Sequence, residues 1–373
     1  MNIVNLFESA LHGIRWSAVM VEALLFSNRD ERRVHPLALP DLLAHAGTRH
    51  TSIWDDRKAA LLQLFSEHVY GVAPSGNVSV HAVTESDGAF LTTFRKKEVT
   101  LSLQCGTRNI PAHLLLLLPG GEGPHPTILG YNFEGNHTVH ADPSITKHPI
   151  FAKRIPGYRY VPHERTRGKR SERWPIENIV TKGYALATLY YGDIEPDYPD
   201  ASSGVRAAYP GLQEREDNFS ALGAWAWGLS RVMDYLTNEP LIDTSHVGLF
   251  GFSRLGKSAL LAAARDERFA SVIADSPGKG GAGLIRRNFG ETLHVMAKKY
   301  PHWFSKKFAS YAGREQELPV DQHTLLALIA PRPVLVSSAD QDWWSDPTGE
   351  KAAVDAARAA YALYGRADSI KHV

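Results

Sequence analysis

The fold is decided by the stretch His246-Val247-Gly248-Leu249-Phe250-Gly251-Phe252-Ser253-Arg254-Leu255-Gly256-Lys257. Its apolar start predicts a buried strand, and the Ala- and Leu-rich segment 258–264 predicts a helix directly after it. A serine on a tight turn between strand and helix is strained, with its hydroxyl exposed above the sheet and the next backbone N–H pointing to where an oxyanion forms. The stretch therefore predicts that Ser253 is a hydrolase nucleophile.

The glycine spacing leaves a second interpretation open. The general motif is Gly-x-Ser-x-Gly, but here Leu255 takes the place of the second glycine and Gly256 follows one residue later. Taken alone, this pattern is also typical of an ordinary turn in which a serine caps a helix.

Strands and helices alternate along the rest of the chain. Apolar runs predict further strands at residues 113–118, 126–130, 184–190, 270–274 and 333–337. Alternating patterns predict antiparallel strands over 78–82 and 94–103. Helical spacing of apolar side chains predicts helices over 55–70, 219–236 and 348–364. We therefore expect an α/β domain with a mostly parallel sheet, and functional loops in the long polar stretches 134–178 and 192–217.

The composition restricts the classes of binding partner and cofactor that we expect. The 373 residues are 43% hydrophobic and 22% charged, which is typical of a globular protein. A formal net charge of +1 predicts no nucleic-acid partner and no membrane binding, and no apolar run is long enough to span a bilayer. The single cysteine, Cys105, excludes an internal disulfide and a cysteine-based zinc cluster. His137, His140 and Asp142 form only a loose group, so we predict no metal and no other cofactor. The composition predicts nothing about the oligomeric state.

Residues 1–36 differ from the domain predicted over 37–373. Their apolar stretch 18–26 is interrupted by Glu22, and no Ala-x-Ala cleavage pattern follows it. We therefore treat this part as an N-terminal extension rather than a signal peptide, which makes the chain as written cytoplasmic.

Gly-x-Ser-Arg-x-Gly-Lys at 251–257 resembles carbohydrate esterase family 15, the glucuronoyl esterases. Similar blocks recur at Tyr131-Asn132-Phe133-Glu134-Gly135-Asn136-His137, Trp225-Ala226-Trp227-Gly228, Pro301-His302-Trp303-Phe304, Leu318-Pro319-Val320-Asp321-Gln322-His323, 327–333 and 342–347. The resemblance covers roughly residues 37–365 and implies an α/β-hydrolase, a three-layer sandwich. It also implies an acyl-enzyme mechanism on uronate (glucuronoyl) or acetyl esters of plant-cell-wall polysaccharide, by a Ser/acid/His triad, in relatives that are secreted or periplasmic.

The resemblance also suggests site residues. It implies that Arg254 joins the oxyanion hole and that Lys257 contacts sugar hydroxyls. Cations at a helix start are electrostatically unfavourable, which favours a functional role for both. Trp344 matches a tryptophan that lines the sugar site, although a packing role is equally compatible with an aromatic residue there.

Three more positions follow from the same resemblance. Asn132, Glu134 and His137 are expected in the oxyanion loop, where they either contact substrate or only hold the loop. Glu291 occupies a family-like position for which the residues themselves suggest no role.

The acid is expected in the loop after strand 333–337. Some relatives place a glutamate after the strand that follows the nucleophile helix, but residues 275–281 contain none, and Asp275 can simply cap that turn. Of Asp342 and Asp346 we favour Asp342, because Asp346 precedes Pro347 and can cap the next helix.

The order serine, acid, histidine places the general base after Asp342, where His372 is the only histidine. We expect His372 in a strand, because relatives continue with a further strand, a His-bearing loop and a final helix. Two hypotheses remain: an esterase, with His372 as its base or with the base beyond a truncated C-terminus, and a carbohydrate-binding homologue that lacks the base.

Overall fold

The protein is described by a computed structural model that covers residues 21, 27–43, 51–75, 79–90, 94–152 and 155–373. Most of the predicted extension, 1–20 and 22–26, lies outside the described residues. None of the helices in the described ranges has the length and apolar composition to cross a membrane.

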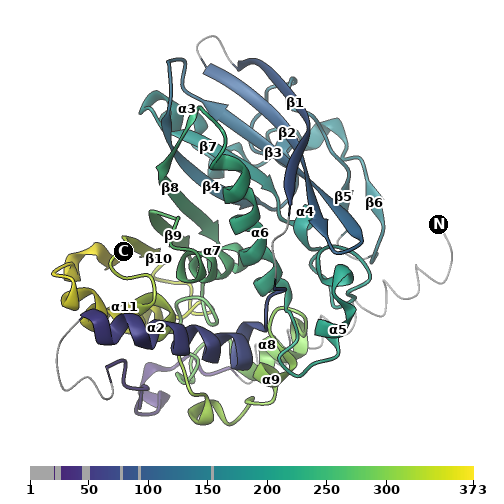
Figure 1. Ribbon diagram of the computed structural model, residues 1–373. Helices are drawn as coiled ribbons and strands as arrows, with labels where there is room; N and C mark the ends of the chain where they lie inside the picture. Colours follow the sequence, from purple (N-terminus) through teal and green to yellow (C-terminus); the bar gives the residue numbers. More distant parts are fainter. Residues whose placement is uncertain (1–20, 22–26, 44–50, 76–78, 91–93, 153–154) are drawn as a thin grey trace.

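A single large sheet organises the described chain (Figure 1). Nine strands lie in the order β1-β2-β3-β7-β4-β8-β9-β10-β11. Their bounds are β1 (Val80–Phe90), β2 (Phe94–Cys105), β3 (Arg108–Leu118), β4 (His125–Asn132), β7 (Ala185–Tyr190), β8 (Ile242–Phe252), β9 (Ser271–Asp275), β10 (Val334–Ser337) and β11 (Ile370–His372). β1, β2, β3 and β7 pair antiparallel, whereas all pairs from β7 to β11 are parallel. The mostly parallel sheet expected from the sequence is therefore confirmed.

Apolar residues on alternate positions of β3 face two separate cores. Leu114, Leu116 and Leu118 belong to the larger core, together with the helix α6 (Ala221–Leu236). Leu115 and Leu117 belong to the smaller one, together with α3 (Ile176–Thr181). Helices thus cover both faces of the sheet, which explains the unbroken run of leucines in this strand.

Further helices complete the fold. They are α2 (Thr51–Phe65), α4 (Tyr191–Ile194), α5 (Pro210–Gln213), α7 (Arg254–Arg265), α8 (Leu293–Lys299), α9 (Lys306–Ala309), α10 (Gln322–Ala327) and α11 (Pro347–Leu363). A π-helical turn, Ser66–Tyr70, continues α2 up to Gly71, where the sequence predicts its end. The first long polar stretch contains the small pair of β5 (Ile150–Phe151) and β6 (Arg159–Tyr160), and the second contains α5, while α3 and α4 each overlap the end of one stretch.

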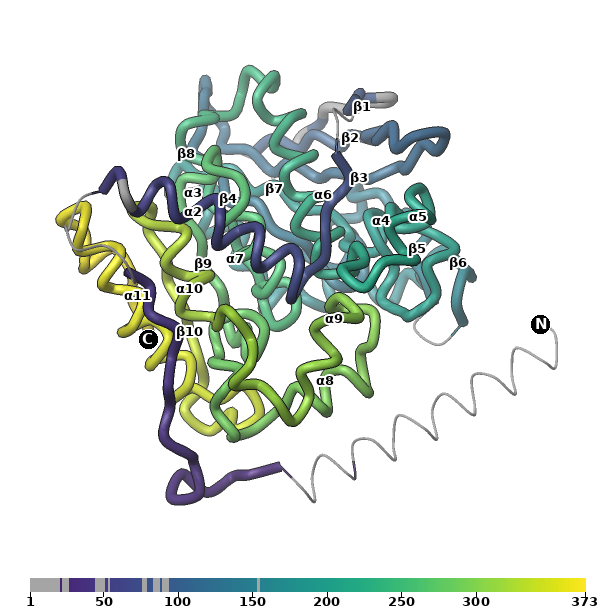
Figure 2. The backbone as a smooth tube through the Cα atoms, turned by 60° about the horizontal axis from the view of Figure 1, so that its bottom comes forward, coloured from purple at the N-terminus to yellow at the C-terminus, as the bar shows by residue number. Residues whose placement is uncertain are grey.

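Two ends of the fold matter for the site. β11 pairs in parallel with β10, so His372 lies in a strand, as expected. At the other end, the described N-terminal residues run along the outside of the molecule, past α11, toward α2 (Figure 2).

Candidate active site

Ser253 lies on the turn between β8 and α7. Its backbone has φ 56° and ψ −128°, a conformation that a residue with a side chain adopts only under strain. Its N–H donates to the carbonyl of Asp275 at 2.8 Å, which ties the turn to the end of β9. Its side chain makes no capping hydrogen bond to α7, all of which is described. Ser253 thus occupies the N-cap position of α7 without a side-chain cap, and its strained backbone matches the geometry of a nucleophile elbow.

The unusual glycine spacing has a steric cause. A Cβ atom on Gly251 would lie 2.3 Å from the carbonyl oxygen of Leu255. A Cβ atom on Gly256 would lie 3.0 Å from the carbonyl oxygen of Gly251. The first turn of α7 thus packs against the end of β8 through Gly251 and Gly256, and position 255 can carry a buried leucine.

Arg254, the residue after Ser253, is held by a network that joins three loops. Its Nη1 forms an ion pair with Asp197, which also accepts hydrogen bonds from His302 Nε2 at 2.9 Å and Trp303 Nε1 at 2.7 Å. The Arg254 Cζ atom lies 5.0 Å from the centre of the Trp303 ring and 5.6 Å from that of Phe133. The guanidinium is therefore fixed by a carboxylate and two aromatic rings.

The charge of Asp197 is secured by the same contacts. Burial alone would raise its pKa, but the Arg254 charge and the hydrogen bonds from His302 and Trp303 outweigh burial and hold the pKa well below its usual range. Sequence reasoning missed this aspartate and His302. The only signals were the length of the 192–217 loop and the block at 301–304.

Lys257, Glu291 and Trp344 form a second cluster. Lys257 is buried, and its Nζ donates to the carbonyls of Pro277 at 2.6 Å and Lys279 at 2.5 Å. Burial lowers the pKa of Lys257 to about 8, although Glu291 opposes this. Burial raises the pKa of Glu291, opposed by Lys257 and by a hydrogen bond from Trp344. The structure thus brings together three residues that the sequence suggested separately.

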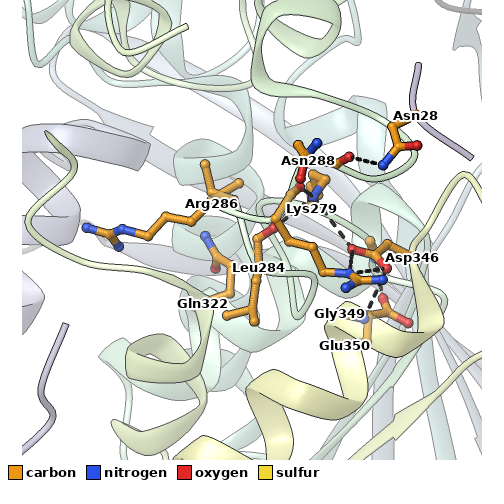
Figure 3. Close-up of polar contacts among 12 residues, drawn as sticks. Asn28, Lys279, Leu284, Arg286, Asn288, Gln322, Asp346, Gly349 and Glu350 are labelled. Carbon is orange, nitrogen blue, oxygen red and sulfur yellow. Dashed lines mark hydrogen bonds and ion pairs between the residues drawn. The ribbon is translucent and has the colours of Figure 1, made fainter. Parts of the chain in front are cut away.

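The two candidate acids have different environments. Asp342 is partly exposed and accepts hydrogen bonds from the backbone N–H of Ser345 at 3.3 Å and its hydroxyl at 2.7 Å. Asp346 is fully buried, pairs with Arg287 Nε at 2.9 Å and caps α11 by accepting from Gly349 N at 3.0 Å (Figure 3). The capping role foreseen for Asp346 is therefore present.

The remaining candidates lie elsewhere. His372 Nε2 is 3.0 Å from the Ser338 hydroxyl, which also contacts Glu350. Within the described residues, none of its hydrogen bonds reaches Ser253 or the two candidate acids. The Asp275 side chain accepts a long hydrogen bond from the neighbouring Ser276, at 3.3 Å.

The residues after β4 hold their own loop. Asn132 donates to Asn136 Oδ1 at 2.7 Å and accepts from Gly135 N at 2.8 Å. Glu134 pairs with Arg170 at 2.7 Å. His137 Nε2 contacts Thr166 Oγ1 at 2.9 Å. These contacts match the loop-holding alternative. Within the part of the chain that the structure describes, no group of three His, Cys, Asp or Glu side chains is placed to hold a metal ion.

The sheet, the strained serine and the helix behind it define an α/β-hydrolase. Comparison with known proteins then identifies the family. The family model described as glucuronyl esterase, fungi, matches residues 174–365. Carbohydrate esterase MZ0003 of an unknown prokaryotic organism is 39% identical over 351 residues, covering 91% of this chain and 81% of the relative.

Solved structures agree. A promiscuous CE15 esterase from a marine bacterial metagenome has 38% identity and a TM-score of 0.83, with 91% of this chain and 88% of that chain covered. A glucuronoyl esterase from Solibacter usitatus has 36% identity and a TM-score of 0.83, with 90% and 88% covered. The chain belongs to carbohydrate esterase family 15, the glucuronoyl esterases.

Proposed function

We propose that this protein hydrolyses the ester bond of a glucuronoyl ester, with Ser253 as the nucleophile. The observation that carries the proposal is the strained elbow at Ser253, followed directly by Arg254, whose guanidinium is fixed by Asp197. Relatives named 4-O-methyl-glucuronoyl methylesterase support a uronate ester as the substrate. One of them, from Phanerochaete chrysosporium, is 34% identical over 213 residues, which are 52% of this chain and 44% of the relative.

In this proposal the Ser253 hydroxyl oxygen attacks the ester carbonyl carbon and its proton passes to a base. The C=O electron pair moves onto the carbonyl oxygen. It then re-forms the carbonyl as the bond to the leaving oxygen breaks, and the base passes its proton to that oxygen, so that the alcohol departs and the acyl-enzyme remains. Water then attacks the acyl-enzyme and releases the uronate. We assign oxyanion stabilisation to the Arg254 guanidinium, of which Asp197 engages Nη1, and to the Arg254 backbone N–H, because the residue after the nucleophile commonly supplies such a donor.

The saccharide is assigned to the Lys257, Glu291 and Trp344 cluster. Two of the three Lys257 N–H groups bind carbonyls, which leaves one donor for a sugar hydroxyl. The Glu291 carboxyl accepts hydrogen bonds, and an indole face suits the C–H surface of a pyranose. Asp342 remains our proposal for the triad acid.

Replacement of the nucleophile tests the function. Ser253→Ala should lower kcat on a methyl glucuronate ester by about a thousand-fold or more. Ser310→Ala, in a surface turn where the hydroxyl donates to Lys307 O, is the matched control and should keep full turnover. Unchanged turnover of Ser253→Ala would refute the proposal. Parallel assays on an acetylated xylan distinguish uronate esters from acetyl esters.

A second candidate function is carbohydrate binding without turnover. It is favoured by the placement of His372, whose Nε2 faces Ser338 rather than the elbow. This candidate predicts that the unmodified protein binds methyl glucuronate in calorimetry but releases no methanol. Ester turnover that is lost in Ser253→Ala would exclude it.

A further inference from the structure

Residues 27–35, which we call the N-terminal strap, lie against the loop 287–290. The Asn28 carbonyl accepts from Gly290 N at 2.9 Å, and Asn28 Nδ2 donates to the Asn288 carbonyl at 2.8 Å (Figure 3). The Asn288 side chain in turn binds the strap backbone at both His35 N, 2.9 Å, and Arg33 O, 3.1 Å. The strap and this loop are therefore joined along their length, although about 250 residues separate them in the sequence.

A chain of charges anchors the strap to the start of α11. Glu31 pairs with the guanidinium of Arg287, whose side chain is only 7% exposed. The Nε of Arg287 binds Asp346, and Asp346 caps α11 at Gly349. A buried guanidinium needs compensating negative charge. Glu31 supplies Arg287 with a second carboxylate, in addition to that of Asp346.

The strap also reaches the tryptophan loop directly. The Arg29 Cζ atom lies 3.9 Å from the centre of the Trp343 ring, within cation–π distance. The Trp343 and Trp344 rings meet edge to face with their centres 5.4 Å apart. Arg29 thus covers the neighbour of the tryptophan that we assign to the saccharide.

Gly290 links the strap to Trp344, because it contacts both the strap and the backbone of the tryptophan loop. It has φ 62°, and a Cβ atom there would lie 2.3 Å from the Trp343 carbonyl oxygen and 2.8 Å from that of Trp344. The next residue, Glu291, donates its N–H to the Trp344 carbonyl at 3.2 Å. The strap, the loop and the Trp343–Trp344 backbone therefore lie side by side in close contact, so a shift of the strap moves Trp344 and Glu291.

We propose that the N-terminal strap positions Trp344 and Glu291 for the saccharide part of the substrate, with Asn28, Arg29 and Glu31 as positioning residues. The inference rests on the proposed function, because that function assigns the saccharide to these side chains. The strap contacts Trp343 and the loop that leads into Glu291, so we expect it to govern substrate recognition and to leave the bond-breaking steps unchanged.

The test compares two esters. Arg29→Ala and Glu31→Gln should each raise KM for a methyl glucuronate ester about five-fold with little change in kcat. Both variants should leave turnover of 4-nitrophenyl acetate, which has no sugar, unchanged. Arg29→Lys keeps a cation over Trp343 and should restore KM. Arg32→Ala is the matched control, because Arg32 is 89% exposed and its ion pair within the described part of the chain is with Asp30, two residues away. An equal loss on both esters, or no change on either, would overturn the proposal.

A second measurement does not depend on catalysis. Hydrogen exchange of the segments 287–291 and 341–346 should be faster in Glu31→Gln than in the unmodified protein and unchanged in Arg32→Ala. Equal protection in Glu31→Gln and the unmodified protein would overturn the strap proposal even if esterase activity is present. Failure of the proposed function is seen separately, as full ester turnover in Ser253→Ala.

Discussion

At the scale of single residues, the site depends on how charges are held next to Ser253. Asp197 collects Arg254, His302 and Trp303 from different parts of the chain. Neither residue spacing nor periodicity links these positions, so sequence reasoning could suggest Arg254 from the motif but could not find its partner. The same limit applies to the Glu31–Arg287–Asp346 network, in which sequence reasoning identified only the capping residue.

We expect Asp197→Asn to lower kcat/KM on a glucuronoyl ester at least about ten-fold, because an amide leaves the Arg254 charge uncompensated and free to move. The loss of a part-buried ion-pair partner should also reduce the free energy of unfolding by about 2 kcal/mol. Asp200→Asn, an exposed aspartate in the same loop, is the control for both measurements. Equal activity of the two variants would contradict a role for Asp197 in holding Arg254.

The low pKa of Asp197 also predicts that the free energy of unfolding falls in acid. A depressed pKa in the folded state contributes stability above the ordinary aspartate value of 3.8, and this stability is lost as the pH falls through the folded pKa.

Lys257 behaves differently. Its folded pKa of about 8 lies below the ordinary lysine value of 10.5, so between these values the unfolded chain binds the extra proton and stability rises with pH.

The pH dependence of the unfolding free energy that Lys257 causes can be measured against a variant whose side chain at this position does not titrate. Between about pH 7.5 and pH 9.5 the unmodified protein should gain about 2 kcal/mol of unfolding free energy relative to Lys257→Met. Urea unfolding of both proteins across this range provides the comparison. A constant difference would mean that burial does not shift the lysine pKa.

At the scale of elements, most of the fold followed from the sequence. Apolar runs predicted strands that are buried on both faces. These include strands of the parallel half of the sheet and also β3, which pairs antiparallel but divides its alternate leucines between two cores. Helix bounds were close: 348–364 was predicted and α11 spans Pro347–Leu363. The glycine spacing of the elbow needed the structure, because only the packing of α7 on β8 shows why Gly256 rather than position 255 is a glycine.

That packing predicts a graded response to added methyl groups. Gly251→Ala should destabilise the protein by about 3 kcal/mol or more, because the new Cβ atom would overlap the backbone of Leu255 at 2.3 Å. Gly256→Ala, with a closest approach of 3.0 Å, should cost less. Gly211→Ala, where a Cβ atom meets nothing within 4 Å, should be nearly neutral, as measured by urea unfolding. A ranking with Gly211→Ala as the most destabilising variant would contradict this account.

At the scale of the whole molecule, segments distant in sequence meet at one edge of the parallel strands. The elbow follows β8, the Trp343–Trp344 loop follows β10, and the strap comes from the opposite end of the chain. The family resemblance could identify the elbow and Trp344 from the sequence, because both belong to sequence motifs. It could not indicate the strap, whose role depends on contacts across about 250 residues.

The sheet is divided into an antiparallel half and a parallel half, and this division sets an order of assembly. β1, β2 and β3 are consecutive hairpin-linked strands, whereas β4, β8, β9 and β10 pair only after long segments have been brought together. Because long loops are slow to close, the hairpins should form first and the parallel half later. Pulsed hydrogen exchange during refolding should protect the amides of β2 and β3 before those of β8 and β9. The nucleophile elbow would then acquire its strained shape among the last steps, so partly folded chains carry the complete hairpins but no esterase site.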